Sequence, residues 1–217
     1  MELVIGDKAF STWSLRPWLV LKRAGAAFGE IQIFLDQPDT TAEILRHSPN
    51  GKVPALKVDG EVIWDSLAIA EWCAERYPEA NLWPAEDKAR WMARSVVAEF
   101  HSGFPALRNE CAMGPNHPMV GPGGPMRPVT GAVGAEVARF IQTIRTARGR
   151  FGRGGPYMFG EWSIADAFYT PVATRVRRHG IDLAGHGDDG VVKAYFDRLL
   201  DEPDFLEWER AGLAERR

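Results

Sequence analysis

The first 80 residues alternate apolar runs with helical spacings. Short apolar runs typical of strands lie at 3–5, 31–35, 53–58 and 62–64. Apolar residues recur with helical spacing over about 14–22, 41–47 and 67–77. Asp59 and Gly60, between the last two strand-like runs, are typical of a hairpin turn. The order is therefore βαβαββα, and we assign this α/β unit to a domain over 1–80.

After a proline-bounded linker at 78–84, helical patterns replace the strand signals. Residues 87–107 predict one long helix that Pro105 kinks. Further helices are predicted at 133–148, 163–178 and 191–200, with a short last one at 204–210. The Gly- and Pro-rich stretch 113–128 predicts a loop, either a lid over a cleft or a disordered insertion. We therefore expect an all-helical bundle over 86–217.

Composition narrows the possible classes of protein. The chain has 217 residues, of which 45% are hydrophobic and 25% charged, which is typical of a folded protein. The net charge of −3 argues against nucleic acid or an anionic membrane as a partner. No apolar run reaches a spanning length, and no secretory signal begins the sequence. Cys73 and Cys111 have no spacing typical of zinc or of a redox pair, so we expect a cytoplasmic protein without metal.

Three hydroxyl side chains lie between the first strand-like run and the first helix: Ser11, Thr12 and Ser14. Proline is best tolerated in the first turn of a helix, so Pro17 predicts a start near Ser14. On this prediction Ser14 is the N-cap and Ser11 is free in the preceding loop. Such hydroxyls either cap the helix or face a ligand at its positive end, and the residues alone leave both readings open.

Two further segments combine a structural reading with a binding one. Pro54 opens a strand, so it is either an edge-strand proline or part of a cis Val53–Pro54 bond. A cis bond would turn the Val53 backbone outward, toward a peptide ligand. Asp65 and Ser66 precede a helix, where they either cap it or bind a carboxylate at its N–H groups, with Asp65 toward an ammonium.

The helical half carries two more signals. Ser163 and Asp166 form a capping-box variant, which we interpret as structural. Arg94, His101 and Arg108 recur every seven residues and would share one face of the long helix. His101 is then either a packing histidine or a group that orients a polar substrate in a cleft between the domains.

Together these segments resemble the glutathione S-transferase superfamily over essentially the whole chain. The likeness is to the serine-type theta and tau classes and to the omega class, and is closest to a little-characterised bacterial subgroup. Residues 50–54 are similar to the segment that ends in the family's cis-proline, and Asp65-Ser66 is similar to its acidic-Ser pair. Ser11 falls on the catalytic serine, where the omega class has cysteine. The resemblance implies a thioredoxin-like first domain and a helical domain that contributes the electrophile site.

The resemblance also implies a chemistry for glutathione as co-substrate. Ser11 would donate a hydrogen bond to the thiolate, and Lys52 would meet the glycine carboxylate. The Val53 backbone would pair with the cysteinyl residue, and Ser66 and Asp65 would hold the γ-glutamyl end. A serine cannot form a mixed disulfide, which disfavours omega-type thiol transfer. The implied protein is a homodimeric detoxifying transferase for a small electrophile; the alternative is a non-catalytic binding module of the same fold.

Overall fold

The computed structural model describes residues 1–215. The strands are β1 (Glu2–Ile5), β2 (Gly29–Gln32), β3 (Ala55–Val58) and β4 (Glu61–Ile63). The helices of the first half are α1 (Thr12–Arg23), α2 (Thr40–Leu45), α3 (Ser66–Arg76) and the 3-10 turn Pro78–Ala80. Those of the second half are α4 (Asp87–Ser102), α5 (Pro105–Glu110), α6 (Gly131–Phe151), α7 (Ile164–His179), the 3-10 turn Ala184–His186, α8 (Val191–Leu200) and α9 (Pro203–Ala214). The predicted βαβαββα order of the first half and the fold class are confirmed.

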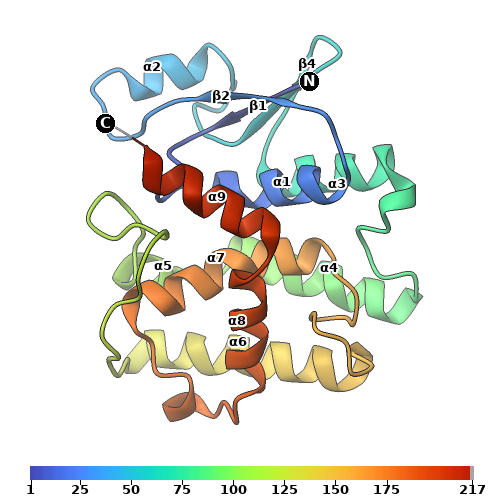
Figure 1. The fold of residues 1–217 in the computed structure, drawn as a ribbon, viewed down its shortest axis with the longest axis vertical. Helices are drawn as coiled ribbons and strands as arrows, with labels where there is room; N and C mark the ends of the chain where they lie inside the picture. The colour runs from blue at the N-terminus through green and yellow to red at the C-terminus, as the bar shows by residue number, and fades with distance from the viewer. Residues whose placement is uncertain (216–217) are drawn as a thin grey trace.

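The four strands form one mixed sheet in the order β2-β1-β3-β4. β1 runs parallel to β2 and antiparallel to β3, and β3 forms the predicted hairpin with β4. Alternation along β1 separates two faces: Leu3 and Ile5 join the main core, whereas Val4 packs with Ile44 of α2. Figure 1 shows α1 and α3 on one side of the sheet and α2 on the other.

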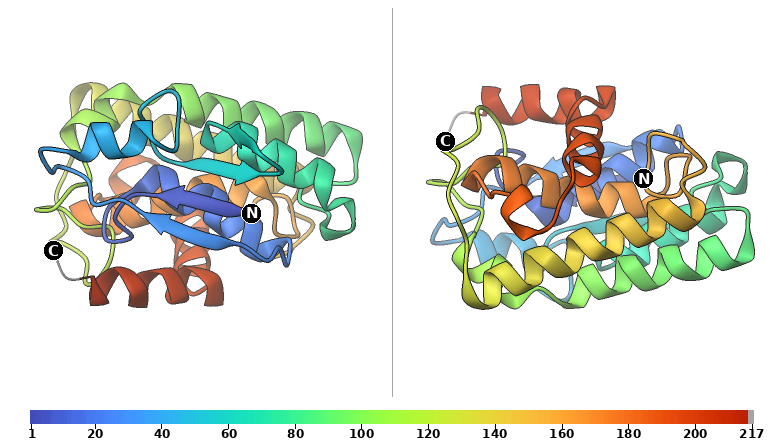
Figure 2. Two further views of the ribbon diagram at one scale, coloured as in Figure 1. Left: turned by 90° about the horizontal axis from the view of Figure 1, so that it is seen from above. Right: turned by 90° about the horizontal axis from the view of Figure 1, so that it is seen from below.

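Helix α7 connects the two halves of the molecule. It packs against α1 on one side and against α4 and α8 on the other, so one apolar core runs from the sheet into the helical half. Figure 2 shows α6 and α4 side by side, and Figure 1 shows α1 and α3 between α7 and the sheet. Within residues 1–215, no helix is both long and apolar enough to cross a membrane.

The second strand ends earlier than the apolar run 31–35 predicts. The Ile33 N–H still donates to the Ile5 carbonyl, at 2.9 Å. The next bonded amide, that of Leu35, donates instead to the Asp7 carboxylate at 2.7 Å, and Asp36 has a positive φ of 60°. A side-chain acceptor and a left-handed residue thus end the strand pairing, although the run stays apolar.

The prediction of one kinked helix over 87–107 is wrong, because the chain breaks between α4 and α5. Phe104 adopts a φ of 62°, and Pro105 has no N–H to continue the ladder. A Cβ on Gly103 would lie 2.7 Å from the Glu99 carbonyl oxygen, so the tight end of α4 requires glycine. The Arg108 side chain donates back to the Gly103 and Phe100 carbonyls and satisfies this helix end.

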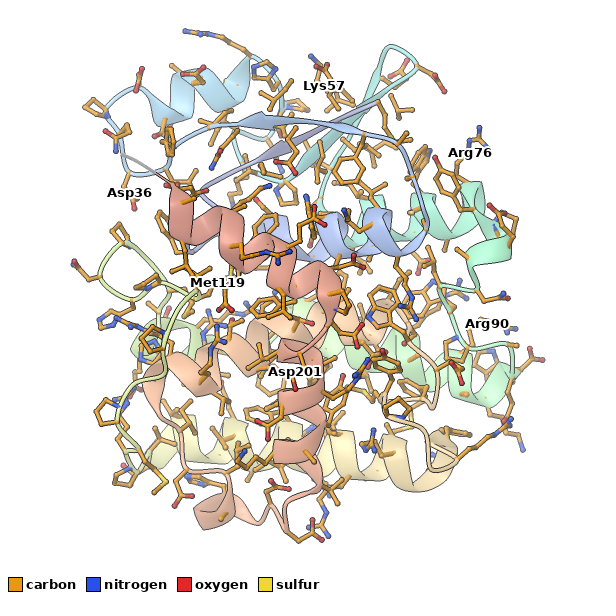
Figure 3. All side chains as sticks on the ribbon, viewed as in Figure 1. Asp36, Lys57, Arg76, Arg90, Met119 and Asp201 are labelled. Atoms are coloured by element: carbon orange, nitrogen blue, oxygen red, sulfur yellow. The ribbon has the colours of Figure 1, made fainter. Side chains whose placement is uncertain are left out.

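The Gly- and Pro-rich segment packs against the rest of the chain. The Met119 side chain is buried, and its N–H donates to the Ala9 carbonyl at 2.8 Å. The Gly124 N–H donates to the Arg177 carbonyl of α7 at 3.1 Å. Figure 3 shows Met119, which belongs to this segment, on the same side of the molecule as Asp36. These contacts fix the segment against α7 and the loop before α1, and argue against the reading as a disordered insertion.

Candidate functional site

A cavity of about 720 Å³ lies where the loop before α1 meets the segment before β3, the start of α3, and helices α5 and α7. Its volume is within the range of about 300–1,000 Å³ that is common for small-ligand sites. Its lining residues are Phe10, Ser11, Thr12, Trp13, Leu35, Asp36, Ile44, Asn50, Gly51, Lys52, Val53, Pro54, Asp65, Arg108, Ala112, Met113 and Arg175. Four of the five predicted site residues, Ser11, Lys52, Val53 and Asp65, therefore come together at one cavity.

Ser11 and Ser14 form a hydroxyl pair at the start of α1. Their Oγ atoms are 2.8 Å apart, and Ser14 Oγ accepts the Gly6 N–H at 3.0 Å. Ser11 lines the cavity, whereas Ser14 is fully buried behind it. Thr12 also lines the cavity, so the geometry leaves two hydroxyls, those of Ser11 and Thr12, beside it.

The prediction that Ser14 is the N-cap is wrong. Helix α1 begins at Thr12, with Ser11 at the N-cap position and Ser14 in the first turn. Pro17 is the sixth helical residue, beyond the first turn, where its missing N–H would cost nothing. The Ser11 backbone N–H donates to the Asp7 carbonyl at 2.8 Å, and this tight turn starts the helix earlier than Pro17 suggests.

The segment before β3 matches its prediction more closely. The Val53–Pro54 bond is cis, as expected, and β3 lies between two strands, so Pro54 is not an edge-strand proline. Lys52 is exposed at the cavity, and its N–H donates to Asn50 Oδ1 at 2.9 Å. Its ammonium makes no ion pair within residues 1–215, so it is free to meet an anionic ligand group.

Asp65 and Ser66, at the start of α3, have different surroundings. Asp65 caps the helix, with Oδ1 accepting the Leu67 N–H at 3.0 Å, and its side chain lines the cavity. The other oxygen, Oδ2, lies 3.0 Å from His101 Nε2 of α4. Ser66 is fully buried, does not line the cavity, and its hydroxyl has no hydrogen-bond partner within residues 1–215. The Trp64–Asp65 bond is also cis.

The three residues expected on one helix face have separate surroundings. Arg94 binds Glu71 of α3, away from the cavity. His101 contacts Asp65 and the ring of Trp13. Arg108, on α5 after the helix break, lines the cavity. The reading of His101 as a group facing a substrate directly is therefore not supported, since His101 does not line the cavity.

Sequence reasoning missed two buried arginines beside Arg108 at this cavity, Arg16 and Arg175. Arg175 is only 4% exposed, and it lines the cavity together with Arg108. Arg16 of α1 is fully buried, with its guanidinium 4.0 Å from the centre of the Trp13 ring. Within residues 1–215, none of the three forms an ion pair with a carboxylate. The available signal in the sequence was the position of Arg16 between Leu15 and Pro17. The structure shows that this helix is buried over most of its length.

The electrostatics of this cluster follow from burial and mutual repulsion. Burial lowers the pKa of Arg175 to about 10, and the nearby charge of Arg108 adds to the effect. Burial also lowers the pKa of Arg16, as do Arg108 and Arg175, while Asp65 opposes them. Buried cations without a counter-ion are costly, so this wall of the cavity strongly favours an anionic ligand group.

Neither cysteine side chain lines this cavity. Cys73 and Cys111 are buried and unpaired, and burial raises the pKa of the Cys73 thiol to about 12. Burial likewise raises the pKa of Cys111. A thiol held in its protonated form is a poor nucleophile. Within the described residues, no group of three or more His, Cys, Asp or Glu side chains could hold a metal ion.

Comparisons with known proteins agree with this geometry. Residues 10–76 match the family described as "Glutathione S-transferase, N-terminal domain". The chain is 30% identical to maleylacetoacetate isomerase of Rhizobium meliloti (strain 1021) over 194 residues, which cover 84% of this chain and 85% of that protein. It is 26% identical to the probable maleylacetoacetate isomerase of Caenorhabditis elegans over 199 residues, 90% of this chain and 86% of that protein.

A solved structure shares the fold along the whole length. It is a glutathione transferase homologue from Burkholderia with bound glutathione, at a TM-score of 0.71 and 23% identity, covering 99% of this chain and 98% of that one. The matched N-terminal domain contains the turn at Ser11, the cis-proline segment and Asp65. The sequence identity to the Rhizobium protein extends through the helical half. The chain therefore belongs to the glutathione S-transferase family.

Proposed function

We propose that this protein is a glutathione-dependent enzyme that uses the glutathione thiolate against a small acidic electrophile. One observation carries the proposal: a single cavity brings Ser11, Lys52 and Asp65 together with the half-buried Arg108 and the buried Arg175. On this proposal residues 1–80 hold glutathione, and residues 86–217 contribute the electrophile side. Glutathione and two unpaired thiols also suit a reducing compartment such as the cytoplasm.

The charges of the cavity complement those of glutathione, which carries two carboxylates, an ammonium and a thiol. Lys52 would offer its ammonium to the glycine carboxylate, and the Val53 backbone, also at the cavity, would pair with the cysteinyl residue. Asp65 offers a carboxylate to the γ-glutamyl ammonium. The N–H groups at the start of α3, with Ser66, would take the remaining carboxylate once the buried hydroxyl turns toward it.

Ser11 is our candidate for thiol activation. A free thiol with a pKa of about 8.5 is mostly protonated at neutral pH, and lowering that pKa by ~2 units requires ~3 kcal/mol. A hydrogen bond to the thiolate together with the positive end of α1 supplies energy of that order. Ser14 supports this role: if its hydroxyl donates to Ser11 Oγ, the Ser11 proton is left for the thiolate.

The arginines suggest the class of the second substrate. A carboxylate seated beside Arg108 and Arg175 would provide the counter-ion that the described residues do not provide. The Rhizobium relative is named for the isomerisation of maleylacetoacetate, a cis-alkene diacid. In such a reaction the thiolate adds to the conjugated double bond and the electron pair moves to the carbonyl oxygen. The new single bond rotates, and the returning electron pair expels the thiolate and leaves the trans alkene.

Kinetics of Arg175→Gln test the acidic substrate class. With a maleyl diacid we expect KM to rise at least about tenfold, because a hydrogen-bonded ion pair of about 1.5–3 kcal/mol is lost. With an uncharged electrophile such as a chloro-nitroarene, and for glutathione itself, we expect changes within about twofold. Arg150→Gln, on the exposed end of α6, is the matched control.

Three results would contradict parts of this proposal. An equal rise in KM for both electrophiles would remove the acidic substrate class. Binding of glutathione without turnover of either electrophile would favour the non-catalytic module. Failure of the protein to bind glutathione at all would reject the proposed function.

A further inference from the structure

The contact between His101 and Asp65 connects the helical half to the predicted ammonium site. His101 Nε2 lies 3.0 Å from Asp65 Oδ2, while Asp65 Oδ1 accepts the Leu67 N–H at 3.0 Å. Both carboxylate oxygens are therefore held, one by the backbone of α3 and one by a side chain of α4. Each oxygen has a second lone pair, and the Asp65 side chain is 46% exposed where it lines the cavity.

The surroundings of the imidazole separate His101 from the cavity. The side chain is 20% exposed and does not line the cavity. The Trp13 ring packs edge-on against it, with ring centroids 5.3 Å apart, and Phe168 of α7 lies on another side at 6.2 Å. Nδ1 is buried without a hydrogen-bond partner within residues 1–215. Within residues 1–215, the polar contact that links the His101 side chain to the cavity is therefore the one with Asp65.

The charge state of His101 decides what Asp65 presents to a ligand. The charged groups that face the imidazole are Asp65 of α3, Arg16 of α1 and Arg108 of α5. Burial and the two arginines lower the pKa of His101, against the opposing effect of Asp65. A neutral imidazole donates its Nε2 proton and leaves the pair with a net negative charge. A protonated imidazole would cancel the charge of Asp65.

We propose that His101 is a positioning residue, which holds the Asp65 carboxylate in place for the α-ammonium of the γ-glutamyl end of glutathione. This inference rests on the proposed function, because it takes glutathione as the ligand and Asp65 as its ammonium partner. The inference makes a specific prediction: the effect of His101 on binding depends on the amino group of the ligand and on no other part of it.

Calorimetric titration with two ligands tests this prediction. The ligands are glutathione and its deaminated analogue, in which hydrogen replaces the α-amino group. For His101→Phe we expect the Kd of glutathione to rise about tenfold and that of the analogue to stay within about twofold. For His101→Gln, whose side-chain amide can still donate to Asp65, we expect most of the glutathione affinity to return.

Two controls separate positioning from general damage to α4. Ser102→Ala removes an exposed neighbouring hydroxyl that donates only to the Ala98 carbonyl, and it should change neither Kd. In an Asp65→Asn background, His101→Phe should have little further effect on glutathione, because the group through which it acts is already neutral. Far-UV circular dichroism and thermal unfolding confirm that each variant is folded, and His101→Gln serves if His101→Phe is not.

The pH dependence adds a readout that a merely structural role would not change. As pH falls through the lowered pKa of His101, the preference of the wild type for glutathione over its analogue should shrink. His101→Gln cannot titrate at this position and should keep a constant preference. Equal losses for both ligands in His101→Phe, or no loss, would overturn the positioning role while leaving glutathione binding intact. A wild type that binds neither ligand would overturn the proposed function, and with it this inference.

Discussion

The hydroxyls of Ser14 and Ser66 are both buried at helix N-termini, yet their partners differ. Ser14 Oγ accepts the Gly6 N–H and pairs with Ser11, whereas Ser66 Oγ has no partner within residues 1–215. Removing the Ser14 hydroxyl would leave a buried N–H unsatisfied, at a cost of about 1–3 kcal/mol. Removing that of Ser66 breaks no hydrogen bond within the described fold. On our proposal, the Ser66 hydroxyl serves to bind the ligand.

Ser66→Ala should therefore weaken glutathione binding without destabilising the protein. We expect a loss of about 1.5–3 kcal/mol in binding, typical of a hydrogen bond to a charged group, and a change in unfolding free energy within about 0.5 kcal/mol. Isothermal titration and urea unfolding of the same preparation measure both quantities. An unchanged affinity would remove Ser66 from the site.

The residues that sequence reasoning brought to this cavity lie beside strong local signals. Pro54 marks the segment of Lys52 and Val53, and the helix start marks Asp65. Arg108 was marked only by its spacing from His101, and Arg175 carries no signal, because the sequence around a helical arginine is the same whether packing buries it or leaves it in water. Only the packing of α5 and α7 around the cavity distinguishes them.

At the level of elements, the start of α7 is the clearest agreement between pattern and structure. Ser163 and Asp166 form the predicted capping box, and Asp166 also accepts from the Met158 N–H at 3.0 Å and the Tyr195 hydroxyl at 2.8 Å. Full burial raises the pKa of Asp166 from its ordinary 3.8 to about 6 despite these donors. The same side chain thus caps α7 and makes the free energy of unfolding depend on pH.

The sign of that pH dependence is testable with Asp166→Asn. The folded pKa lies above the unfolded one, so Asp166 favours folding most below pH 4 and loses this contribution as pH rises toward 6. The change is about 3 kcal/mol over that window. The stability advantage of wild type over Asp166→Asn should therefore shrink from pH 4 to pH 7. Urea unfolding at several pH values measures it, and a growing advantage would contradict the raised pKa.

Element boundaries were predicted less well than element types, for identifiable reasons. The start of α1 is set by a turn closed through the Asp7 carbonyl, which a local reading of Pro17 does not reveal. The break after α4 depends on Phe104 taking a left-handed conformation that its side chain does not favour. In both cases a backbone turn or conformation that the residue types do not signal sets the boundary.

On the scale of the whole molecule, the exposed tryptophans suggest a second copy of the chain. Trp91 of α4 is 61% exposed, and Trp64, just before α3, is 45% exposed. Large exposed aromatic surface is typical of an interface. We keep the homodimer as a prediction on this basis.

Sedimentation velocity at micromolar concentration should give a dimer of about 48 kDa, twice the chain mass of 24.1 kDa. Trp91→Asp should shift the protein toward monomer, because a charge would enter an apolar interface. Met126→Asp, at a residue 77% exposed on the segment between α5 and α6, is the control and should leave the dimer intact. A monomeric wild type would contradict the prediction.

The central claim is that Ser11 stabilises the thiolate of glutathione bound in this cavity, and the thiolate absorbance of bound glutathione against pH tests it most directly. For Ser11→Ala we expect a higher thiol pKa and conjugation slower by about one to two orders of magnitude at mildly acidic pH, or roughly 1.4–2.7 kcal/mol. For Ser14→Ala, which leaves the Ser11 hydroxyl beside the cavity, we expect a smaller rise. A titration that moves in Ser14→Ala or in Thr12→Val, but not in Ser11→Ala, would contradict the account.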